Sequence, residues 1–426
     1  MPPLQEFIKR IVGPDVPIRI TAYDGTDIGP SDAKATIVFR SPDALRRIVT
    51  APGELGFARA FVAGDIAIEG DIYEALLLQD RFSAMKLGPK QIAEAACMVG
   101  PAGLRPLPPP PEEARIKGRR HSRERDAQAI AHHYNVSNRF YQLFLGSTMT
   151  YSCAVFEQRD DSLERAQTNK YELISRKLDL KPGMRLLDVG CGWGGMVMHA
   201  AKHHGVTAVG VTVSQRQVDM ARARVAAAGL ADQVEIRFQD YRDVADGPYD
   251  AISSIGMFEH VGLTQLGEYF ERVRSLLVPN GRLLNHAISR PPFERERIMR
   301  AGFMNRYVFP DGELHEIGKV TSALQEAGFE ARHMESMREH YARTLRLWVA
   351  NLEANWDEAV AETSLARARI WRLYMAAAAV NFELNRTQIH QILAVNNQPN
   401  EGDAGVALRP TWTGSLADVA PVLATR

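Results

Sequence analysis

The strongest constraint on the fold is an alternation of strand-like and helix-like segments in the middle of the chain. Segments with strand-like patterns occur at residues 185–189, 206–211, 234–238, 249–254 and 282–288. Segments with helical periodicity separate them at residues 194–204, 214–229 and 264–277. Parallel strands joined by helical crossovers form a doubly wound sheet. We therefore predict an α/β domain here, followed by helices over residues 342–384 and a closing strand at residues 388–395.

A proline-rich segment divides the chain. Six of the fourteen residues from Gly100 to Glu113 are proline, which is excluded from helix interiors and central strands and favours extended geometry. This segment indicates a linker between two domains. The predicted parts are a smaller mixed α/β domain, a linker and a larger domain, at residues 1–99, 100–125 and 126–426. In the smaller domain, two strand-like segments and a helical segment lie at residues 18–23, 35–39 and 41–50.

Composition and charge exclude several classes of protein. The 426 residues are 45% hydrophobic, which excludes a disordered, collagen-like or coiled-coil chain. Lys and Arg (51) balance Asp and Glu (51), so an anionic partner would be met by a local patch. Cys97, Cys153 and Cys191 form no CxxC pattern, so we expect neither a disulfide framework nor a metal site. With no signal peptide and no apolar run of about 18 residues, we expect a cytosolic protein.

The string LLDVGCGWGG at residues 186–195 indicates a cofactor loop. Its four glycines follow an apolar strand and let the backbone turn tightly and approach a ligand. A nicotinamide dinucleotide would require an acidic residue about 20 positions later, but residues 210–212 are Gly, Val and Thr. The segments 209–217 and 239–243 follow the next two strands and meet the glycine loop at the carboxyl edge of the sheet, where ligands bind. S-adenosylmethionine (SAM) therefore fits this loop better.

Six motifs occur in order along the chain: HHYNVSNRFYQLFLGSTMTYSCAVF, LLDVGCGWGG, VTVSQRQ, GMFEHVG, LLNHAIS and EHYARTLRLW. Together they resemble the cyclopropane-fatty-acid synthase family, which includes the mycolic acid methyltransferases. The resemblance covers residues 126–395. It implies a doubly wound, seven-stranded, Rossmann-like SAM-methyltransferase sheet. It also implies that the smaller N-terminal domain is the one found in full-length, phospholipid-acting members.

The resemblance implies the positions of two ligand sites. SAM is expected beside residues at the strand ends and in the preceding segment: Tyr151, Ser152, Asp188, Gly190, Gly192, Thr212, Val213, Gln217, Asp240 and Tyr241. A bound hydrogencarbonate ion is expected as the base, held by Cys153, Glu259, His286, Ile288 (through its backbone) and Tyr341. A histidine and a tyrosine can donate hydrogen bonds to its oxygens, and a carboxylate can accept its O–H.

The reaction that the resemblance implies starts from an unactivated cis alkene, a poor nucleophile, which attacks the sulfonium methyl group of SAM. The enzyme must align the two groups, exclude water and tolerate a carbocation. Aromatic faces stabilise a cation by about 1–2 kcal/mol each when desolvated. We expect Phe140, Phe144, Phe303 and Tyr307 beside the acyl chain, and ordinary core packing is the alternative for each.

Residues 115–125 contain six basic residues and one acidic residue. We hypothesise that this stretch lies on anionic lipid headgroups, which would make the protein peripheral at the inner, cytoplasmic face of the membrane. A solvated charged face is the alternative. The balanced total charge and the lack of a recognised binding module argue against nucleic acid as the partner.

These observations lead to one predicted function and three alternatives. The leading prediction is a cyclopropane-fatty-acyl-phospholipid synthase, which adds a methylene carbon from SAM across the cis double bond of a phospholipid acyl chain. The same methylation giving a 10-methylene branch, a precursor of tuberculostearate, is the first alternative. A non-catalytic lipid-binding protein on a methyltransferase scaffold and a small-molecule methyltransferase are the others. The resemblance also implies a homodimer formed through the N-terminal domain.

Overall fold

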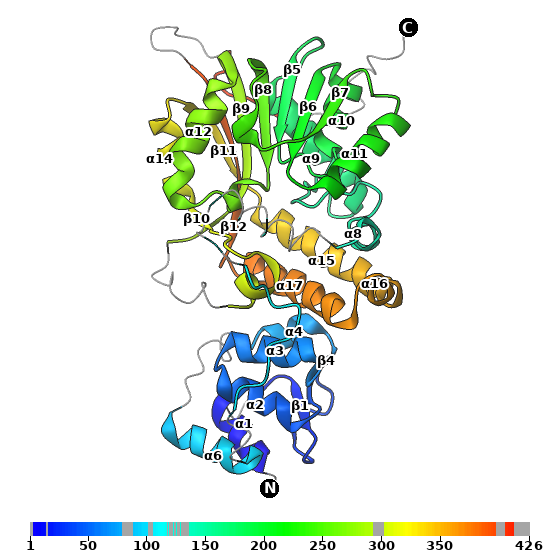
Figure 1. Ribbon diagram of the computed structural model, residues 1–426, viewed down its shortest axis with the longest axis vertical. Coiled ribbons are helices and arrows are strands. Elements are labelled where there is room, and N and C mark those ends of the chain that lie inside the picture. Colours follow the sequence, from blue (N-terminus) through cyan, green and yellow to red (C-terminus); the bar gives the residue numbers. More distant parts are fainter. Residues whose placement is uncertain are drawn as a thin grey trace. The chain divides into compact units, whose positions relative to one another are not determined.

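The computed structural model describes residues 3–13, 16–78, 88–100, 105–116, 118, 122, 125, 128, 136–292, 302–397 and 405–412. The chain divides into two compact units (Figure 1). The first comprises Met1–Arg115, Glu294–Pro310 and Trp356–Val380. The second comprises Ile116–Phe293, Asp311–Asn355 and Asn381–Arg426. Residues 302–310 and 356–380, which the sequence analysis assigned to the larger domain, therefore pack with the N-terminal residues.

The first unit is built on a four-stranded sheet. Its strands, in spatial order, are β2 (Asp27–Ile28), β1 (Arg19–Ala22), β3 (Ala35–Phe39) and β4 (Ile66–Gly70). β1 and β3 are parallel, and the other pairs are antiparallel. Buried residues alternate with half-buried ones along β3, as expected for a strand with one face on a core. The helices are α1 (Pro3–Val12), α2 (Pro42–Thr50), α3 (Glu54–Ala63), α4 (Ile72–Leu76), α6 (Pro89–Val99), α16 (Trp356–Glu362) and most of α17 (Leu365–Glu383).

Polar contacts join three separate segments of the first unit. Arg59, on α3, donates two hydrogen bonds of 2.8 Å to the buried carboxylate of Glu113. The hydroxyl of Tyr307, in the short helix η5 (Met304–Val308), donates to Glu113 Oε2 at 3.2 Å. The backbone N–H of Ala114 donates to the carbonyl of Arg306 at 2.7 Å. The segment around η5 is therefore fixed to the N-terminal residues by specific bonds.

The second unit contains the doubly wound sheet that the sequence predicts. Its strands, in spatial order, are β11 (Glu330–Ser336), β12 (Gln388–Val395), β9 (Leu277–Arg290), β8 (Tyr249–Ile255), β5 (Arg185–Val189), β6 (Thr207–Thr212) and β7 (Val234–Phe238). The two-residue strand β10 (His315–Glu316) also pairs with β9. The strands from β9 to β7 are parallel, and β12 is antiparallel to both of its neighbours. The predicted α/β fold is confirmed, and β5, β7 and β12 have the predicted bounds.

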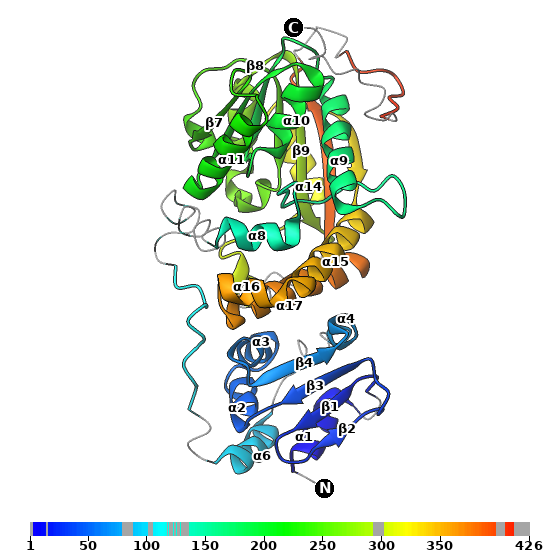
Figure 2. The same ribbon diagram turned by 90° about the vertical axis from the view of Figure 1, so that its right-hand side faces the viewer.

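Helices cover both faces of this sheet (Figures 1 and 2). On one face, α12 (Leu266–Ser275) and α14 (Ile317–Glu326) contribute side chains such as Phe270 and Leu324 to a buried apolar cluster. On the other face, a second cluster is formed with α9 (Leu163–Leu178), α10 (Gly195–His204) and α11 (Gln215–Ala227). Because both faces are buried, the central strands are nearly continuous apolar runs. Two further helices, α8 (Asn138–Leu145) and α15 (Arg338–Ala354), pack on each other.

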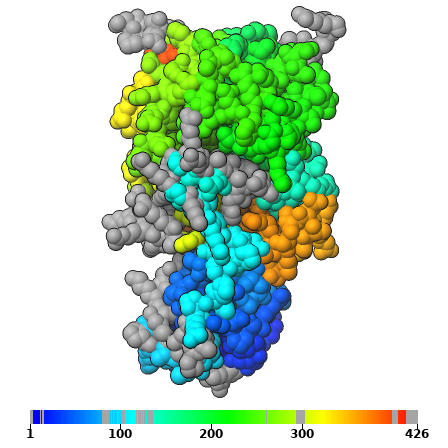
Figure 3. Space-filling model, in the orientation of Figure 1, coloured from blue at the N-terminus to red at the C-terminus, as the bar shows by residue number. Residues whose placement is uncertain are grey.

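Figure 3 shows one face of the molecule. On this face, most of the surface of the second unit is formed by the segments coloured green. Within the described ranges, no helix is both long enough and apolar enough to cross a lipid bilayer.

The basic stretch 115–125 is described only in part: Lys117, Arg119, Arg120 and Arg123 lie outside the described residues. Arg125 donates from Nη2 to Asp311 Oδ1 at 2.9 Å, so this basic residue is paired with an acid of the second unit.

Candidate active site

The second unit has a cavity of about 190 Å³ at the carboxyl ends of β5, β6, β7 and β8. Its walls come from the loops that follow these strands and from the segment that precedes α9. All ten residues that the sequence analysis assigned to SAM line this cavity: Tyr151, Ser152, Asp188, Gly190, Gly192, Thr212, Val213, Gln217, Asp240 and Tyr241. Ligands of open α/β sheets bind at this edge, so the cavity is the candidate cofactor site.

The glycine loop after β5 leaves little room for side chains. Gly190 and Gly192 have φ angles of +80° and +56°, in the left-handed region that favours glycine. A Cβ on Gly190 would lie 3.0 Å from the Cβ of Met257, and one on Gly195 would lie 2.0 Å from the hydroxyl of Tyr171. Since α10 begins at Gly195, a residue of the cavity wall, its first turn also borders the cavity.

Replacing Gly195 by alanine should disrupt this wall. The new Cβ would overlap the Tyr171 hydroxyl, which shares a buried hydrogen bond of 2.7 Å with Thr150. We expect overpacking to lower the free energy of unfolding by about 1–3 kcal/mol and SAM affinity, measured by calorimetry, to fall about tenfold or more. Gly267→Ala is the matched control, because a Cβ there, on α12, meets nothing within 4 Å. Equal stability and SAM affinity in the two variants would contradict this prediction.

Polar side chains at the ends of β6 and β7 are held in place by neighbours. The hydroxyl of Thr212 donates to Gln217 Oε1 at 2.7 Å. The carboxylate of Asp240 accepts hydrogen bonds from Nε and Nη2 of Arg242 at 2.9 and 2.6 Å. The side chains of Thr212 and Asp240 are therefore oriented by bonds within this chain.

Lys170 is a residue of the cavity wall that the sequence analysis missed. It is fully buried on α9 and donates from Nζ to Ser152 Oγ at 2.8 Å. Burial lowers the pKa of Lys170 to about 7 and raises that of nearby Asp188 to about 6. Asp188 accepts a hydrogen bond of 2.6 Å from Ser253. No clear signal in the sequence marks this residue, because only the structure shows that α9 buries polar side chains at many positions: Gln167, Asn169, Lys170, Glu172, Ser175 and Lys177.

A second group of polar side chains lies near the end of β9. Glu259, in the short helix η3 (Phe258–His260), accepts a hydrogen bond at Oε1 from the Ile288 N–H at 2.7 Å. The Ile288 amide, assigned to the ligand from the sequence, therefore positions this carboxylate. Burial raises the pKa of Glu259 to about 7. Glu259 Oε2 and Nε2 of the buried His286 have no hydrogen-bond partner among the described residues. Since buried polar atoms normally have partners, these two open atoms indicate a polar ligand.

A chain of hydrogen bonds fixes which ring nitrogen of His286 carries the proton. Lys177, buried on α9, donates from Nζ to Gln391 Oε1 at 2.7 Å, and an ammonium group can only donate. The amide nitrogen of Gln391 therefore faces His286 and donates to Nδ1 at 3.2 Å. Burial lowers the pKa of His286, so the ring is neutral and its proton is on Nε2. The open Nε2 of His286 is thus a hydrogen-bond donor.

Of the other members of the predicted hydrogencarbonate site, Tyr341 lies in the first turn of α15, and Cys153, between α8 and α9, lies beside the start of that helix. The buried thiol of Cys153 lies 3.8 Å from the carbonyl oxygen of Met337, and Tyr341 is buried four residues further along the chain. Burial raises the pKa of the Cys153 thiol and lowers that of the His286 ring. In both cases the charge of nearby Lys170 adds a smaller effect, which lowers the pKa.

Aromatic side chains lie next to the cofactor cavity. Phe140 and Phe144, on α8, are fully buried, with ring centroids 5.6 Å apart. The ring of Phe144 lies 6.3 Å from that of Tyr151, which lines the cavity. Phe303 and Tyr307 belong to the first unit, where their rings are 5.5 Å apart. The four residues expected beside an acyl chain therefore form two pairs, one in each unit.

A doubly wound sheet whose glycine loop and neighbouring strand ends enclose a cavity is the architecture of the SAM-dependent methyltransferases. Solved structures with this fold include enzymes of that class, and the protein is a SAM-dependent methyltransferase with SAM as its cofactor. The family model described as mycolic acid cyclopropane synthetase matches residues 121–392, and the chain belongs to this family. The resemblance inferred from the six motifs is confirmed.

Three known proteins show how far the similarity extends. The probable fatty acid methyltransferase Rv3720 of Mycobacterium tuberculosis (strain ATCC 25618 / H37Rv) is 47% identical over 407 residues, covering 93% of this chain and 95% of the relative. Tuberculostearic acid methyltransferase UfaA1 of the same organism is 31% identical over 404 residues, covering 92% and 91%. The crystal structure of mycolic acid cyclopropane synthase CmaA1 complexed with SAH and CTAB is 34% identical, with a TM-score of 0.60, covering 63% of this chain and 98% of that one. Similarity to the first two relatives therefore extends beyond the region shared with CmaA1.

Proposed function

We propose that this methyltransferase transfers a one-carbon unit from SAM to the cis double bond of a phospholipid acyl chain and closes it to a cyclopropane. The observation that carries the proposal is the pair of open atoms: the acceptor Glu259 Oε2 and the donor His286 Nε2, both without a partner among the described residues. An alkene has no proton to lose before it attacks SAM, but the cation that results must lose one afterwards. A site of this kind therefore needs a base that acts after methyl transfer.

SAM, when bound, supplies the electrophilic methyl group. We assign the backbone of the glycine loop and the Ser152 hydroxyl, held by Lys170, to its methionyl part. Thr212, with its partner Gln217, is assigned to the ribose side, and Asp240 to the adenine side. The buried rings beside Tyr151 exclude water from the reacting carbons and present aromatic faces to a cation.

Hydrogencarbonate fits the second polar group. Its O–H matches the open carboxylate oxygen of Glu259, and its other oxygens match the N–H that the hydrogen-bond chain places on Nε2 of His286. Cys153 and Tyr341 complete the proposed set. When bound, this ion would supply the base that accepts the proton. The role of Glu259 is to hold the ion through its O–H, and the role of His286 is to donate to a second oxygen.

A lipid acyl chain is the proposed substrate because buried aromatic rings lie next to the cavity and because of the relatives. The ring of Phe144 lies 6.3 Å from that of Tyr151 in the cavity wall, and Phe140 packs on Phe144. Rv3720 is named a probable fatty acid methyltransferase, and UfaA1 a tuberculostearic acid methyltransferase. We assign membrane contact to the basic stretch 115–125 and self-association to the first unit, which would give a peripheral membrane homodimer.

A 10-methylene acyl chain is the second candidate product. The similarity to UfaA1, which covers 92% of this chain, favours it. Both products begin with the same methylation. In this alternative, a hydride shift follows methylation, and the proton then leaves the added carbon without ring closure.

Identifying the product distinguishes these two candidate reactions. The purified chain is incubated with SAM and vesicles of dioleoyl phospholipid, and the acyl chains are analysed by mass spectrometry and proton NMR. A one-carbon gain with upfield ring protons is expected. The same gain with exocyclic vinyl protons would establish the methylene product instead. No gain, with SAM binding demonstrated by calorimetry, would overturn the proposed substrate.

Removing dissolved carbon dioxide and hydrogencarbonate should slow product formation about tenfold or more, because the cation then lacks its base. SAM affinity should stay unchanged, since the SAM cavity contains neither Glu259 nor His286. The measurement is transfer of labelled methyl groups in degassed buffer, with hydrogencarbonate added back to restore the rate. Sodium chloride at equal ionic strength is the control and should restore nothing. A rate that is unaffected by depletion would rule out hydrogencarbonate as the ligand of the open atoms.

A further inference from the structure

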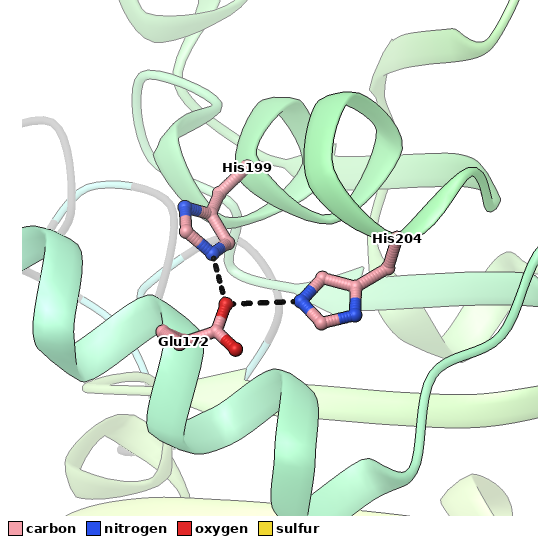
Figure 4. Close-up of side chains that lie close together, drawn as sticks. All are labelled: Glu172, His199 and His204. Atoms are coloured by element: carbon pink, nitrogen blue, oxygen red, sulfur yellow. Dashed lines mark hydrogen bonds and ion pairs between the residues drawn. The ribbon is translucent and has the colours of Figure 1, made fainter. Parts of the chain in front are cut away.

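A second cluster of metal-ligating side chains lies outside the walls of the SAM cavity. Glu172 on α9 and His199 and His204 on α10 point toward one another (Figure 4). They are 4%, 8% and 9% exposed, and none of them lines the SAM cavity. The sequence analysis expected no metal, because its search relied on cysteine patterns. We propose that these three residues bind a divalent transition-metal ion, for which Zn²⁺ is the probe.

The three ligand atoms already have the spacing of a metal site. Nε2 of His199 and Nε2 of His204 lie 3.2 and 3.0 Å from Oε2 of Glu172. All three atoms lie within 4.8 Å of one another. In a tetrahedral zinc site with bonds of about 2.0–2.2 Å, neighbouring ligand atoms are about 3.3 Å apart. Small side-chain rotations would therefore admit an ion, with the protons of the two rings on Nδ1.

The chemistry of the cluster also fits zinc. Two imidazole nitrogens and one carboxylate oxygen form a common zinc ligand set, with the fourth position taken by water. Arg176 donates to Glu172 Oε1 at 2.6 Å, which holds the carboxylate so that Oε2 faces the two histidines. Outer hydrogen bonds of this kind orient the ligands of metal sites. The competing explanation is a triad joined only by two N–H···O hydrogen bonds.

The position of the cluster gives the ion a structural role. α9 also carries Lys170 and Tyr171, which line the SAM cavity, and α10 begins at Gly195 in the glycine loop. An ion bound to both helices would fix α9 against α10, and with them two walls of the cofactor site. Because the ligands lie outside the cavity wall, the ion itself would not contact SAM.

Metal binding can be measured on the full chain without any assay of activity. Chelator-treated protein is dialysed against Zn²⁺, and the bound metal is counted by mass spectrometry while melting temperature and affinity are measured. We expect about one Zn²⁺ per chain, a higher melting temperature with zinc, and binding about tenfold weaker or more in His204→Gln. His203→Gln is the matched control: His203 lies next to His199, with ring centroids 4.7 Å apart, but contributes no atom to the cluster.

Two results would overturn the proposal. One is that wild type and His204→Gln bind Zn²⁺ with the same stoichiometry and affinity. The triad would then be joined only by hydrogen bonds, and the bound zinc would be adventitious zinc on the surface. The other is measured on the wild type alone, in case the variant fails to fold. Chelator-treated wild type is titrated with Co²⁺, and the proposal predicts the intense visible bands of a tetrahedral nitrogen and oxygen site. Absence of these bands would rule out the proposed coordination.

Discussion

Replacing Glu259 by glutamine will strongly reduce product formation and will at the same time make the folded protein more stable, most of all above neutral pH. Glutamine keeps an oxygen that can accept the hydrogen bond from the Ile288 N–H, which Glu259 Oε1 accepts at 2.7 Å. Its other end is an amide nitrogen, which donates and cannot accept the O–H of a bound anion. We expect turnover to fall about 100-fold or more while SAM affinity is retained, because Glu259 is not part of the SAM cavity.

The gain in stability follows from the pKa of Glu259. Burial raises it from 4.5 to about 7 on folding. The folded state therefore binds this proton more tightly, and the resulting stability is fully present below pH 4.5 and lost as the pH rises through 7. Glutamine carries no charge to bury. Relative to wild type, we expect the variant to gain about 1 kcal/mol at pH 5 and about 3 kcal/mol at pH 8 in the free energy of unfolding.

Urea denaturation at both pH values measures this difference, and labelled methyl transfer measures turnover. Glu271→Gln, an exposed carboxylate on α12, is the control and should change neither quantity. A gain in stability that is the same at pH 5 and pH 8 would show that charge burial is not its cause. Turnover at the wild-type rate would remove Glu259 from the proposed site.

Replacing Gln391 by glutamate will reverse the hydrogen-bond chain that ends at His286. A carboxylate can accept from Lys177 on one oxygen, as Gln391 does at 2.7 Å, and from the imidazole on the other. It cannot donate to Nδ1, as the Gln391 amide nitrogen does at 3.2 Å. The ring proton should therefore move from Nε2 to Nδ1, and the open Nε2 should become an acceptor that repels an anion. Because the wrong tautomer is as damaging as a lost residue in other histidine sites, turnover should fall about 100-fold or more.

Nitrogen NMR of histidine-labelled protein reports the tautomer directly, so this prediction has a readout besides rate. SAM affinity should change by less than about twofold, because Gln391 lies outside the SAM cavity. Gln388→Glu, on the same strand, is the control: Gln388 donates to Asn385 at 2.9 Å and is not part of the chain. If the spectrum of the wild type shows the ring proton of His286 on Nδ1, the assignment of Nε2 as the hydrogen-bond donor is refuted.

Local sequence pattern was sufficient for the sheet and for the cofactor cavity. β5, β7 and β12 occupy the predicted residues because each has a strand-like pattern, which is mostly apolar in β5 and alternates apolar and charged residues in β7, and each is followed by a glycine or a polar residue. The carboxyl ends of parallel strands share one edge. Side chains as distant in sequence as Asp188 and Asp240 therefore had to meet there, and both line the cavity.

Contacts that depend on tertiary placement could not be predicted in this way. Lys177 and Gln391 are separated by 214 positions, and no periodic pattern links them. Residues 302–310 contact the first unit through the buried carboxylate of Glu113, whose partners Arg59 and Tyr307 are distant in sequence. Glu172 and His199 meet only because α9 and α10 cover the same face of the sheet.

β12 lies between β9 and β11, although it follows both of them in the chain. During synthesis, every residue of the SAM cavity, up to Gln265, therefore leaves the ribosome more than a hundred residues before Gln391. The strand that pairs with the outer edge of β9 is therefore made after all the residues of the cofactor cavity. That same strand carries Gln391, so the last part of the sheet to be synthesised also sets which nitrogen of His286 holds the proton.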